Sequence, residues 1–347
     1  MRTIPLRFRT PTILAFYLLA TPWAFAKPFP AGIVNLCTGQ ITPKNTLGNL
    51  AKRPWANPNV SGMRVKTQWR YAQPNSGTYD WTGLDEALGL ANANGKFLGL
   101  SVVAGLSTPP WVYDAGATKY VLRDGTNGAM PLPWEDAFLS RWTGFIRAMG
   151  VRYDGNPALR YVVISGLGQA TETYLAKTSA DATALTALGG PSAWVRAAKQ
   201  IIAAYAEAFP TTPFFMTMAI PFPSTDPRPL HDTALLAEQE VVNWAVATYP
   251  GRFGLMTASL NAHSATGYYP NLAIYNYHLA QPAGFQMLAS NFQDGGVRNR
   301  GTLADCIAAG IQLGGKFVEV YEADVDDPAQ QGLLAAEDIA LNAVAGP

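Results

Sequence analysis

The sequence contains little cysteine, histidine or charge. Among its 347 residues are two cysteines, Cys37 and Cys306, and three histidines, His231, His263 and His278. These five residues are scattered without the clustered spacing of metal ligands, so we expect no metal site. Charged residues make up only 14% of the chain, whereas aromatic residues make up 11%. This combination is typical of a large, well-packed body with aromatic-lined surfaces.

The N-terminus carries the pattern of an export signal. Three arginines occur among the first nine residues, an apolar run covers residues 12–20, and Ala24-Phe25-Ala26 supplies a small-x-small cleavage pattern. Together these features predict a signal peptide over residues 1–26 and a secreted or periplasmic mature chain over residues 27–347. The alternative is an uncleaved N-terminal anchor, although the apolar run is short for spanning a membrane.

The charge of the mature chain excludes some partners. Removing residues 1–26 takes away three arginines and no acid, so the formal net charge falls from +1 to −2. A near-neutral chain lacks the electrostatic footprint of a nucleic-acid-binding protein, and we expect no nucleic-acid partner. No later stretch reaches the roughly 20 apolar residues that a spanning helix needs, so we expect no membrane partner after cleavage. The sequence leaves the oligomeric state open.

The state of the two cysteines has two interpretations. An exported protein can join Cys37 to Cys306 in a disulfide. Cys37 ends a predicted strand and Cys306 lies in a predicted helix, so two buried free thiols are equally compatible with the sequence.

Apolar runs and amphipathic segments alternate along the chain. Eight short apolar runs predict strands at residues 32–37, 62–69, 97–104, 161–165, 214–220, 253–260, 284–289 and 317–321. Helical spacing is clearest at residues 84–94, 137–151, 192–209, 235–248 and 302–313, and weakest at residues 44–59. Eight such units without a linker predict one closed (β/α)8 barrel, a TIM barrel. The alternative, a doubly wound open sheet, requires a Gly-rich phosphate loop, and residues 32–40 contain none.

Barrel enzymes place their chemistry at the carboxyl ends of the strands and in the loops that follow. The fourth predicted strand leads into Gly166-Leu167-Gly168 and then Glu172. The two glycines allow a tight exit, and Glu172 follows at the expected mouth of the barrel. Cleavage of a glycosidic bond needs a proton donor of this kind. The alternative is a surface glutamate that caps the next helix.

The eighth predicted strand contains a second candidate carboxylate. Glu319 and Tyr321 share one face of this strand, whereas Glu322 and Asp324 share the other, because side chains alternate along a strand. An acid within an apolar strand is costly to bury without a partner. The sequence does not fix which face is inward. We favour Glu319 as the second carboxylate, with Glu322 as the alternative.

Several polar and aromatic residues are candidates for binding a substrate. Arg64 lies within the second strand, where an arginine inside a barrel usually orients a carboxylate, so a structural ion pair with Glu319 is an alternative role for that acid. Trp69 and Trp111 follow the second and third strands, and their indole faces are candidates for stacking on sugar rings. Other candidates carry hydroxyl-binding groups near the sixth and seventh strands: Asn261, His263, His278 and Gln286.

The segment from Arg64 to Trp111 resembles barrel glycoside hydrolases of clan A, especially the family 42 β-galactosidases. Their pattern of an arginine on the second strand, Pro-x-x-Gly-x-Tyr-Asp-aromatic and a helix with Leu-Asp matches Arg64, residues 74–81 and Leu84-Asp85. Thr108-Pro109-Pro110-Trp111 is similar to the end of their third strand. The run from Gly166 to Glu172 also resembles the acid-bearing loop of the family 14 β-amylases. Both resemblances imply that Glu172 donates the proton.

The chain departs from the clan A pattern at two positions. Thr171 stands where these enzymes usually carry asparagine before the acid, and the seventh strand leads into residues 290–294 without a glutamate. The second carboxylate is then Asp294 or an eighth-strand acid, unless the strand count is off by one, and we favour the eighth strand.

The main hypothesis is hydrolysis of a glycosidic bond in an oligosaccharide or polysaccharide by two carboxylates, without metal or organic cofactor. The alternatives are a non-catalytic carbohydrate-binding barrel and a lyase or transglycosylase on the same scaffold.

Overall fold

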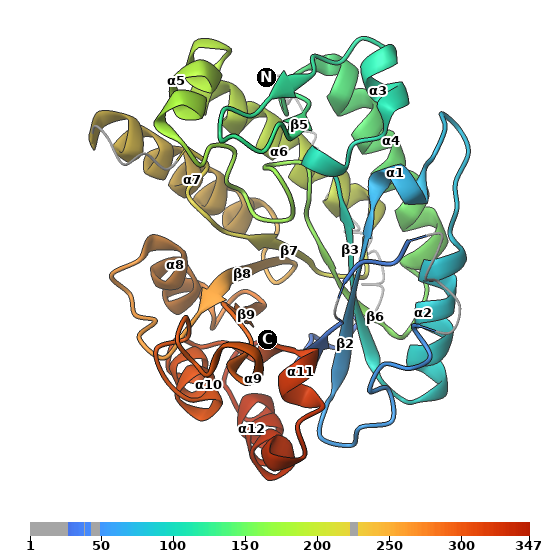
Figure 1. The fold of residues 1–347 in the computed structure, drawn as a ribbon, viewed down its shortest axis with the longest axis vertical. Helices are drawn as coiled ribbons and strands as arrows, with labels where there is room; N and C mark the ends of the chain where they lie inside the picture. The colour runs from blue at the N-terminus through green and yellow to red at the C-terminus, as the bar shows by residue number, and fades with distance from the viewer. Residues whose placement is uncertain (1–26, 38, 43–48, 223–227) are drawn as a thin grey trace, which may run out of the picture.

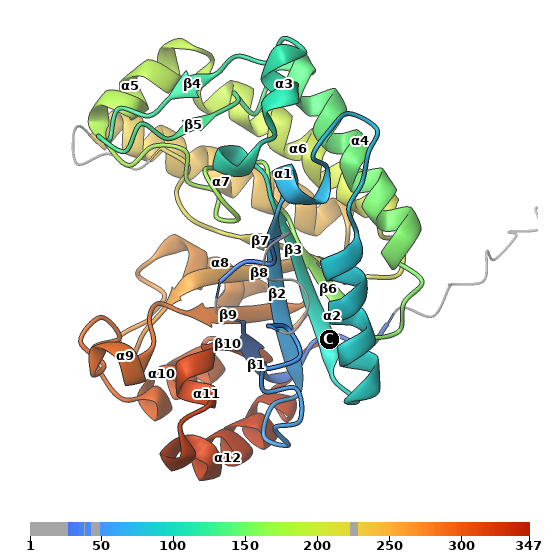
Figure 2. The ribbon, with the colours of Figure 1, turned by 45° about the vertical axis from the view of Figure 1, so that its right-hand side comes forward.

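The computed structural model describes residues 27–37, 39–42, 49–222 and 228–347, with side chains from residue 234 onward in the last range. The predicted signal peptide lies outside these residues. Figure 1 shows a ring of strands surrounded by helices, and Figure 2 shows the same arrangement from a second side. Within the part of the chain that is described, no helix has both the length and the apolar character needed to cross a membrane.

Eight parallel strands close into a barrel in the order β1-β10-β9-β8-β7-β6-β3-β2. Their bounds are β1 Gly32–Leu36, β2 Gly62–Gln68, β3 Phe97–Val103, β6 Leu159–Val163, β7 Phe214–Thr217, β8 Phe253–Leu260, β9 Ala283–Met287 and β10 Phe317–Tyr321. Each corresponds to one of the eight predicted apolar runs. The predicted TIM barrel is therefore confirmed, and the open-sheet alternative is wrong because β1 pairs with β10 and closes the ring.

Helices cover the outside of the barrel and bury their apolar faces against the strands. The longer ones are α2 Thr82–Ala93, α4 Asp136–Tyr153, α6 Gly190–Ala208, α7 Arg228–Thr248, α8 Tyr269–Tyr277, α10 Leu303–Gln312 and α12 Gln331–Asn342. The start of α10 shows how the local sequence begins a helix. The Thr302 side chain accepts a hydrogen bond from the backbone of Asp305, and the Asp305 carboxylate accepts one from the backbone of Thr302. This capping box satisfies two backbone donors that the helix leaves unpaired.

The loops at the carboxyl ends of the strands contain the irregular elements. Short helices occur there at α1 Trp69–Ala72, α3 Pro110–Asp114, α5 Ser179–Ala187, α9 Asn291–Asp294 and α11 Glu322–Val325. A small hairpin, β4 Tyr120–Val121 with β5 Ala129–Met130, lies beside α3 and α5 (Figures 1 and 2) and is absent from the sequence-based expectation. Residues 49–61, between β1 and β2, form turns without a helix, which agrees with the weak helical pattern there.

Aromatic rings fill the amino-terminal half of the barrel interior. Four rings each lie across a glycine of a neighbouring strand, and a Cβ atom on that glycine would come within 2.0–2.4 Å of the ring: Phe97 on Gly62, Tyr161 on Gly99, Phe215 on Gly254 and Phe317 on Gly284. The centroids of Tyr161, Phe215 and Phe317 are 5.2–5.4 Å apart. Among the described residues, this layer fills the lower part of the barrel, so we expect a ligand to approach from the carboxyl ends of the strands.

The two cysteines are separate buried thiols. Cys37 follows β1 and accepts a hydrogen bond from the Asn35 amide, and the Cys306 thiol contacts the Asn299 carbonyl within the α10 region. Of the two interpretations of the sequence, the structure therefore supports the free thiols.

Candidate active site

The loop after β6 positions Glu172 at the mouth of the barrel. Gly166 has φ +91°, and a Cβ atom there would come 2.5 Å from the Trp142 indole nitrogen. A Cβ atom on Gly168 would lie 2.2 Å from the Glu172 carbonyl oxygen. Only glycine fits at either position, because Gly166 has a positive φ and lies against α4, and Gly168 lies against the backbone of its own loop. The Gly-Leu-Gly run thus fixes where the half-buried Glu172 side chain emerges.

The segment around Glu172 extends the barrel sheet by one short parallel bridge. Glu172 pairs with Thr217 at the end of β7, and the Thr173 amide donates to the Thr217 carbonyl at 3.1 Å. The Glu172 side chain accepts a hydrogen bond of 3.4 Å from the Thr171 hydroxyl. Attachment to a strand end holds this carboxylate more firmly than a free loop would.

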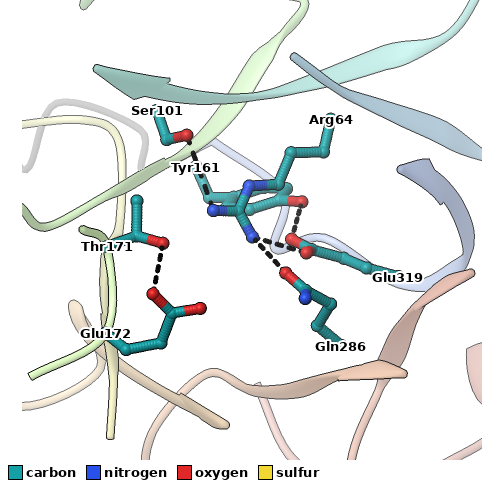
Figure 3. A network of polar contacts seen from close by, with 7 residues as sticks. All are labelled: Arg64, Ser101, Tyr161, Thr171, Glu172, Gln286 and Glu319. Carbon is teal, nitrogen blue, oxygen red and sulfur yellow. Dashed lines mark hydrogen bonds and ion pairs between the residues drawn. The ribbon is translucent and has the colours of Figure 1, made fainter. Parts of the chain in front are cut away.

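A buried ion pair faces Glu172 from the other side of the mouth (Figure 3). Arg64 on β2 donates from Nη1 to Glu319 Oε2 on β10 at 2.5 Å, and Tyr161 on β6 donates from its hydroxyl to Glu319 Oε1 at 2.7 Å. Arg64 is 1% exposed and Glu319 is 0% exposed. Weaker contacts from Arg64 reach Gln286 at 3.3 Å and Ser101 at 3.5 Å.

The charges of this pair stabilise each other. Burial alone would lower the pKa of Arg64, but the neighbouring Glu319 carboxylate outweighs it and raises that pKa. Burial and the same carboxylate raise the pKa of Tyr161, which keeps its hydroxyl protonated as a donor. Both oxygens of Glu319 therefore have a partner within the protein.

The direction of the eighth-strand side chains is now settled. Glu319 and Tyr321 point into the barrel, in the layer above Phe317. Glu322 follows as the first residue of α11 and points away from the interior, where it accepts from Asn35 at 3.4 Å and pairs with Arg53. The expectation that Glu322 is an alternative second carboxylate is wrong, because alternation along β10 places it outside the ring of strands.

Asp294 is the other alternative for the second carboxylate, and both of its carboxylate oxygens accept hydrogen bonds from the backbone of its own loop. Its Oδ1 accepts from the Gly296 amide at 2.9 Å, and its Oδ2 accepts from the Arg298 amide at 3.4 Å. These bonds shape the turn after α9.

The predicted aromatic platform is only partly in place. Trp69 is fully buried against α4, with ring centroids 4.9 Å from Trp142 and 6.1 Å from Phe138. The expectation that it stacks on a sugar is wrong, because no face of the ring is free. Trp111 on α3 packs edge-on against Trp69 at 5.9 Å and donates from its indole nitrogen to the Gln73 carbonyl at 3.1 Å. It keeps a partly exposed edge.

The predicted hydroxyl-binding residues divide between the two ends of the barrel. Gln286 points into the mouth beside Arg64, as expected. Asn261 lines a neighbouring cavity of about 410 Å³ together with His263, but its amide is engaged by the backbone of its own turn. His278 follows α8 and precedes β9, so it lies at the amino end, where its Nδ1 contacts the Tyr275 carbonyl at 2.8 Å. The expectation that His278 contacts the substrate is wrong for this reason.

Two charged residues near the site were missed by the sequence analysis. Lys66 is two positions after Arg64 on the same inward face of β2 and lines a cavity of about 180 Å³. Burial lowers the pKa of Lys66, and Arg64 lowers it further. Alternation along the strand predicts this direction of Lys66 once Arg64 is placed inside the barrel. Glu238 on α7 is fully buried beneath the acid-bearing loop and accepts from the Thr173 hydroxyl at 2.9 Å, and no sequence pattern indicates that contact.

The comparisons with known proteins identify no family for this chain. No family model matches the sequence, and no curated protein is detectably similar to it. Many solved structures are distantly similar to the chain, and three of them are described below. A psychrophilic glycoside hydrolase family 10 endo-β-1,4-xylanase is 13% identical, with 84% of this chain and 86% of that chain covered and a TM-score of 0.48.

The catalytic domain of the major endoglucanase from Xanthomonas campestris pv. campestris is 13% identical, with 88% and 93% covered and a TM-score of 0.47. Endo-glycoceramidase II from Rhodococcus sp. is 14% identical, with 76% and 75% covered and a TM-score of 0.44. Similarity this low carries no argument about what the chain does. The resemblance to families 42 and 14 stays a prediction.

Proposed function

We propose that this protein is a secreted glycoside hydrolase that binds an oligosaccharide or polysaccharide at the carboxyl end of its barrel. The observation that carries the proposal is the placement of Glu172 and Glu319, from opposite sides of the ring, around one mouth (Figure 3). Hydrolysis of a glycosidic bond requires two carboxyl groups that flank the sugar. Glu172 is the half-buried one and takes the role of proton donor to the leaving oxygen.

Glu319 is the second carboxylate in this proposal. Arg64 forms an ion pair with it, and the Tyr161 hydroxyl donates a hydrogen bond to it, so its position is fixed before a substrate arrives. A preorganised negative charge beneath the sugar ring stabilises the positive charge that develops in the transition state. Gln286 and Tyr321 supply neutral hydrogen-bonding groups beside it for sugar hydroxyls.

A second candidate function is glycan binding without turnover. Glu319 is 0% exposed, and both of its oxygens have partners, so no substrate atom touches it in this conformation. On the seventh strand of the barrel, β9, the inward residue is the neutral Gln286. Both observations favour a barrel that retains a sugar-binding mouth and lacks the second reacting carboxylate.

Glu172→Gln separates the two functions. A panel of oligosaccharides is screened for hydrolysis by product mass, which also reveals the unsaturated or transferred products of a lyase or transglycosylase. If Glu172 is the acid, the variant loses about 10²–10⁴-fold in turnover and binds substrate within about threefold of the wild type. The matched control is Glu207→Gln, an exposed acid on α6. Wild-type binding without any turnover would favour the second candidate.

A further inference from the structure

Among the described residues, one cation and no acid line a cavity at the mouth of the barrel. Its volume is about 180 Å³, and the described residues that line it are Leu36, Cys37, Gly39, Lys66, Gln286, Gln293, Tyr321 and Ala323. Apart from the Lys66 ammonium, the polar groups here are neutral. Burial raises the pKa of the Cys37 thiol to about 12 and also raises the pKa of Tyr321, so neither contributes a negative charge near neutral pH.

The Lys66 ammonium differs from the other cations of this region. Arg64 pairs with Glu319, and Arg53 pairs with Glu322, so both arginines are neutralised by acids from the β10 segment. Among the described residues, Lys66 Nζ has no ion pair and no hydrogen bond. Glu172 lies across the mouth and accepts a hydrogen bond from the Thr171 hydroxyl; its charge acts on Lys66 only at a distance, where it partly offsets the lowering of the Lys66 pKa by burial and by Arg64.

The charge distribution along the sequence explains why Lys66 lacks a partner. The first 79 residues contain ten lysines and arginines and no aspartate or glutamate. Every acid that neutralises β1, β2 and their connection must therefore come from another segment. Two of the β10-segment acids are used by the two arginines. The described lining of the cavity therefore has Lys66 as its one charged side chain.

We propose that Lys66 binds an anionic substituent of the glycan, so that the substrate of this site is an acidic saccharide. A half-buried ammonium without a counter-ion is costly, and a carboxylate or sulfate oxygen in the cavity would repay that cost. Gln286, Gln293 and Tyr321 surround the same space with groups that suit ring hydroxyls. A hexuronate carboxylate and a sulfate ester share this chemistry. The inference rests on the proposed function, because it specifies the substrate class of the same site.

The test compares oligosaccharides that differ only in charge. Tetrasaccharide pairs of the same linkage are used: cellotetraose with its fully C6-oxidised glucuronate form, galactotetraose with tetragalacturonate, and each neutral member with a sulfated form. Binding is measured by calorimetry in the Glu172→Gln background, so that turnover does not interfere. We expect at least one acidic member to bind at least tenfold more tightly than its neutral partner, with an affinity that falls as salt rises.

The variants assign the preference to Lys66. Lys66→Met should abolish the preference while neutral oligosaccharides bind as before, and Lys66→Arg should restore part of it. The control is Lys119→Met, an exposed lysine outside the cavity, which should change nothing. Equal binding of neutral and acidic members, a preference that survives in Lys66→Met, or no binding of any acidic probe would each overturn the inference.

The outcome is separable from the proposed hydrolysis. Tight binding of an acidic probe that wild-type protein never cleaves would remove the proposed function and keep the inference. Cleavage of neutral glycans by the wild type, together with equal binding of the neutral and acidic members of each pair, would keep the proposed function and remove the inference. The sulfated and uronate arms distinguish the source of the anionic group.

Discussion

Arg64 and Glu319 form an ion pair, 2.5 Å between Nη1 and Oε2, at a depth in the barrel that solvent does not reach. Moving two charges out of water has a large desolvation penalty, and the attraction between the charges offsets it only where further hydrogen bonds complete the geometry. Tyr161, Gln286 and Ser101 supply those bonds. Such a pair contributes a defined charge arrangement to the site more than it contributes net stability.

Removal of one partner from this pair should be strongly destabilising. In Arg64→Met the Glu319 charge stays buried without compensation, and we expect the free energy of unfolding to fall by about 3–5 kcal/mol. The measurement is urea unfolding followed by circular dichroism. Arg64→Met combined with Glu319→Gln should lose less than the sum of the two single variants, because no isolated charge remains.

The exposed pair of Arg147 and Glu207 provides the control for that experiment. Its atoms are 3.5 Å apart, and the side chains are 53% and 66% exposed. Arg147→Met should change the free energy of unfolding by less than about 1 kcal/mol. A loss of similar size at Arg64 would show that the buried pair is not formed as described.

The sequence was sufficient for the barrel because burial produces an obvious pattern. Strands of a parallel barrel are covered on both faces, so each appears as a continuous apolar run, and all eight were located within a few residues. The sequence alone does not determine which side chains of a strand point into the barrel. Two phases of alternation fit Glu319 and Glu322 equally well, and only the pairing of β10 with β1 and β9 selects one.

Strand alternation also determines the direction of the side chains in and just after β2. Trp69 is five positions after Arg64, so a strand that turns Arg64 inward must turn Trp69 outward toward α4. Lys66 follows from the same rule and was overlooked. His278 precedes its strand and therefore lies at the wrong end of the barrel. The contact of Glu238 with Thr173 is different, since it joins α7 to a loop 65 residues away and no local pattern predicts it.

Gly99 should not tolerate a side chain. A Cβ atom there would come 2.0 Å from the Tyr161 ring, and the hydrogen bond from Tyr161 to Glu319 prevents that ring from moving aside. We expect Gly99→Ala to lower the free energy of unfolding by about 1–3 kcal/mol or more. Gly89→Ala on α2, where nothing lies within 4 Å, should instead raise it by up to about 1 kcal/mol. Chemical denaturation of both variants is the measurement, and equal effects would contradict the described ring layer.

Both cysteines should resist thiol reagents in the native protein. They are buried and unpaired, and burial raises the pKa of Cys37 to about 12 and that of Cys306 to about 11. The reactive thiolate is therefore scarce at pH 8. We expect an aromatic disulfide reagent to label no thiol per native chain and two per chain in guanidinium. Two unreactive sulfurs after unfolding without reductant would instead indicate a disulfide.

Glu238 makes the stability of the protein depend on pH. Burial raises its pKa to about 7, and the Thr173 hydroxyl bond only partly offsets this rise. In the unfolded chain the same group ionises near its ordinary pKa of 4.5. Between these two values the folded state holds a proton that the unfolded state has released, so stability falls as pH rises through that window. Above pH 7 the full loss, at most about 3 kcal/mol, is present.

Glu238→Gln removes this titration while keeping an acceptor for Thr173. We expect the variant to be more stable than the wild type at pH 8 and equally stable near pH 4.5. The measurement is the free energy of unfolding in urea across this pH range, which should change less with pH in the variant. Glu240→Gln, on the same helix but exposed and paired with Lys199, is the control and should follow the wild-type profile. A Glu238→Gln profile parallel to the wild-type profile would mean that Glu238 is already ionised in the folded protein. Its Oε2 atom has no partner among the described residues, so an ionised Glu238 would need a cation or a water molecule beside that atom.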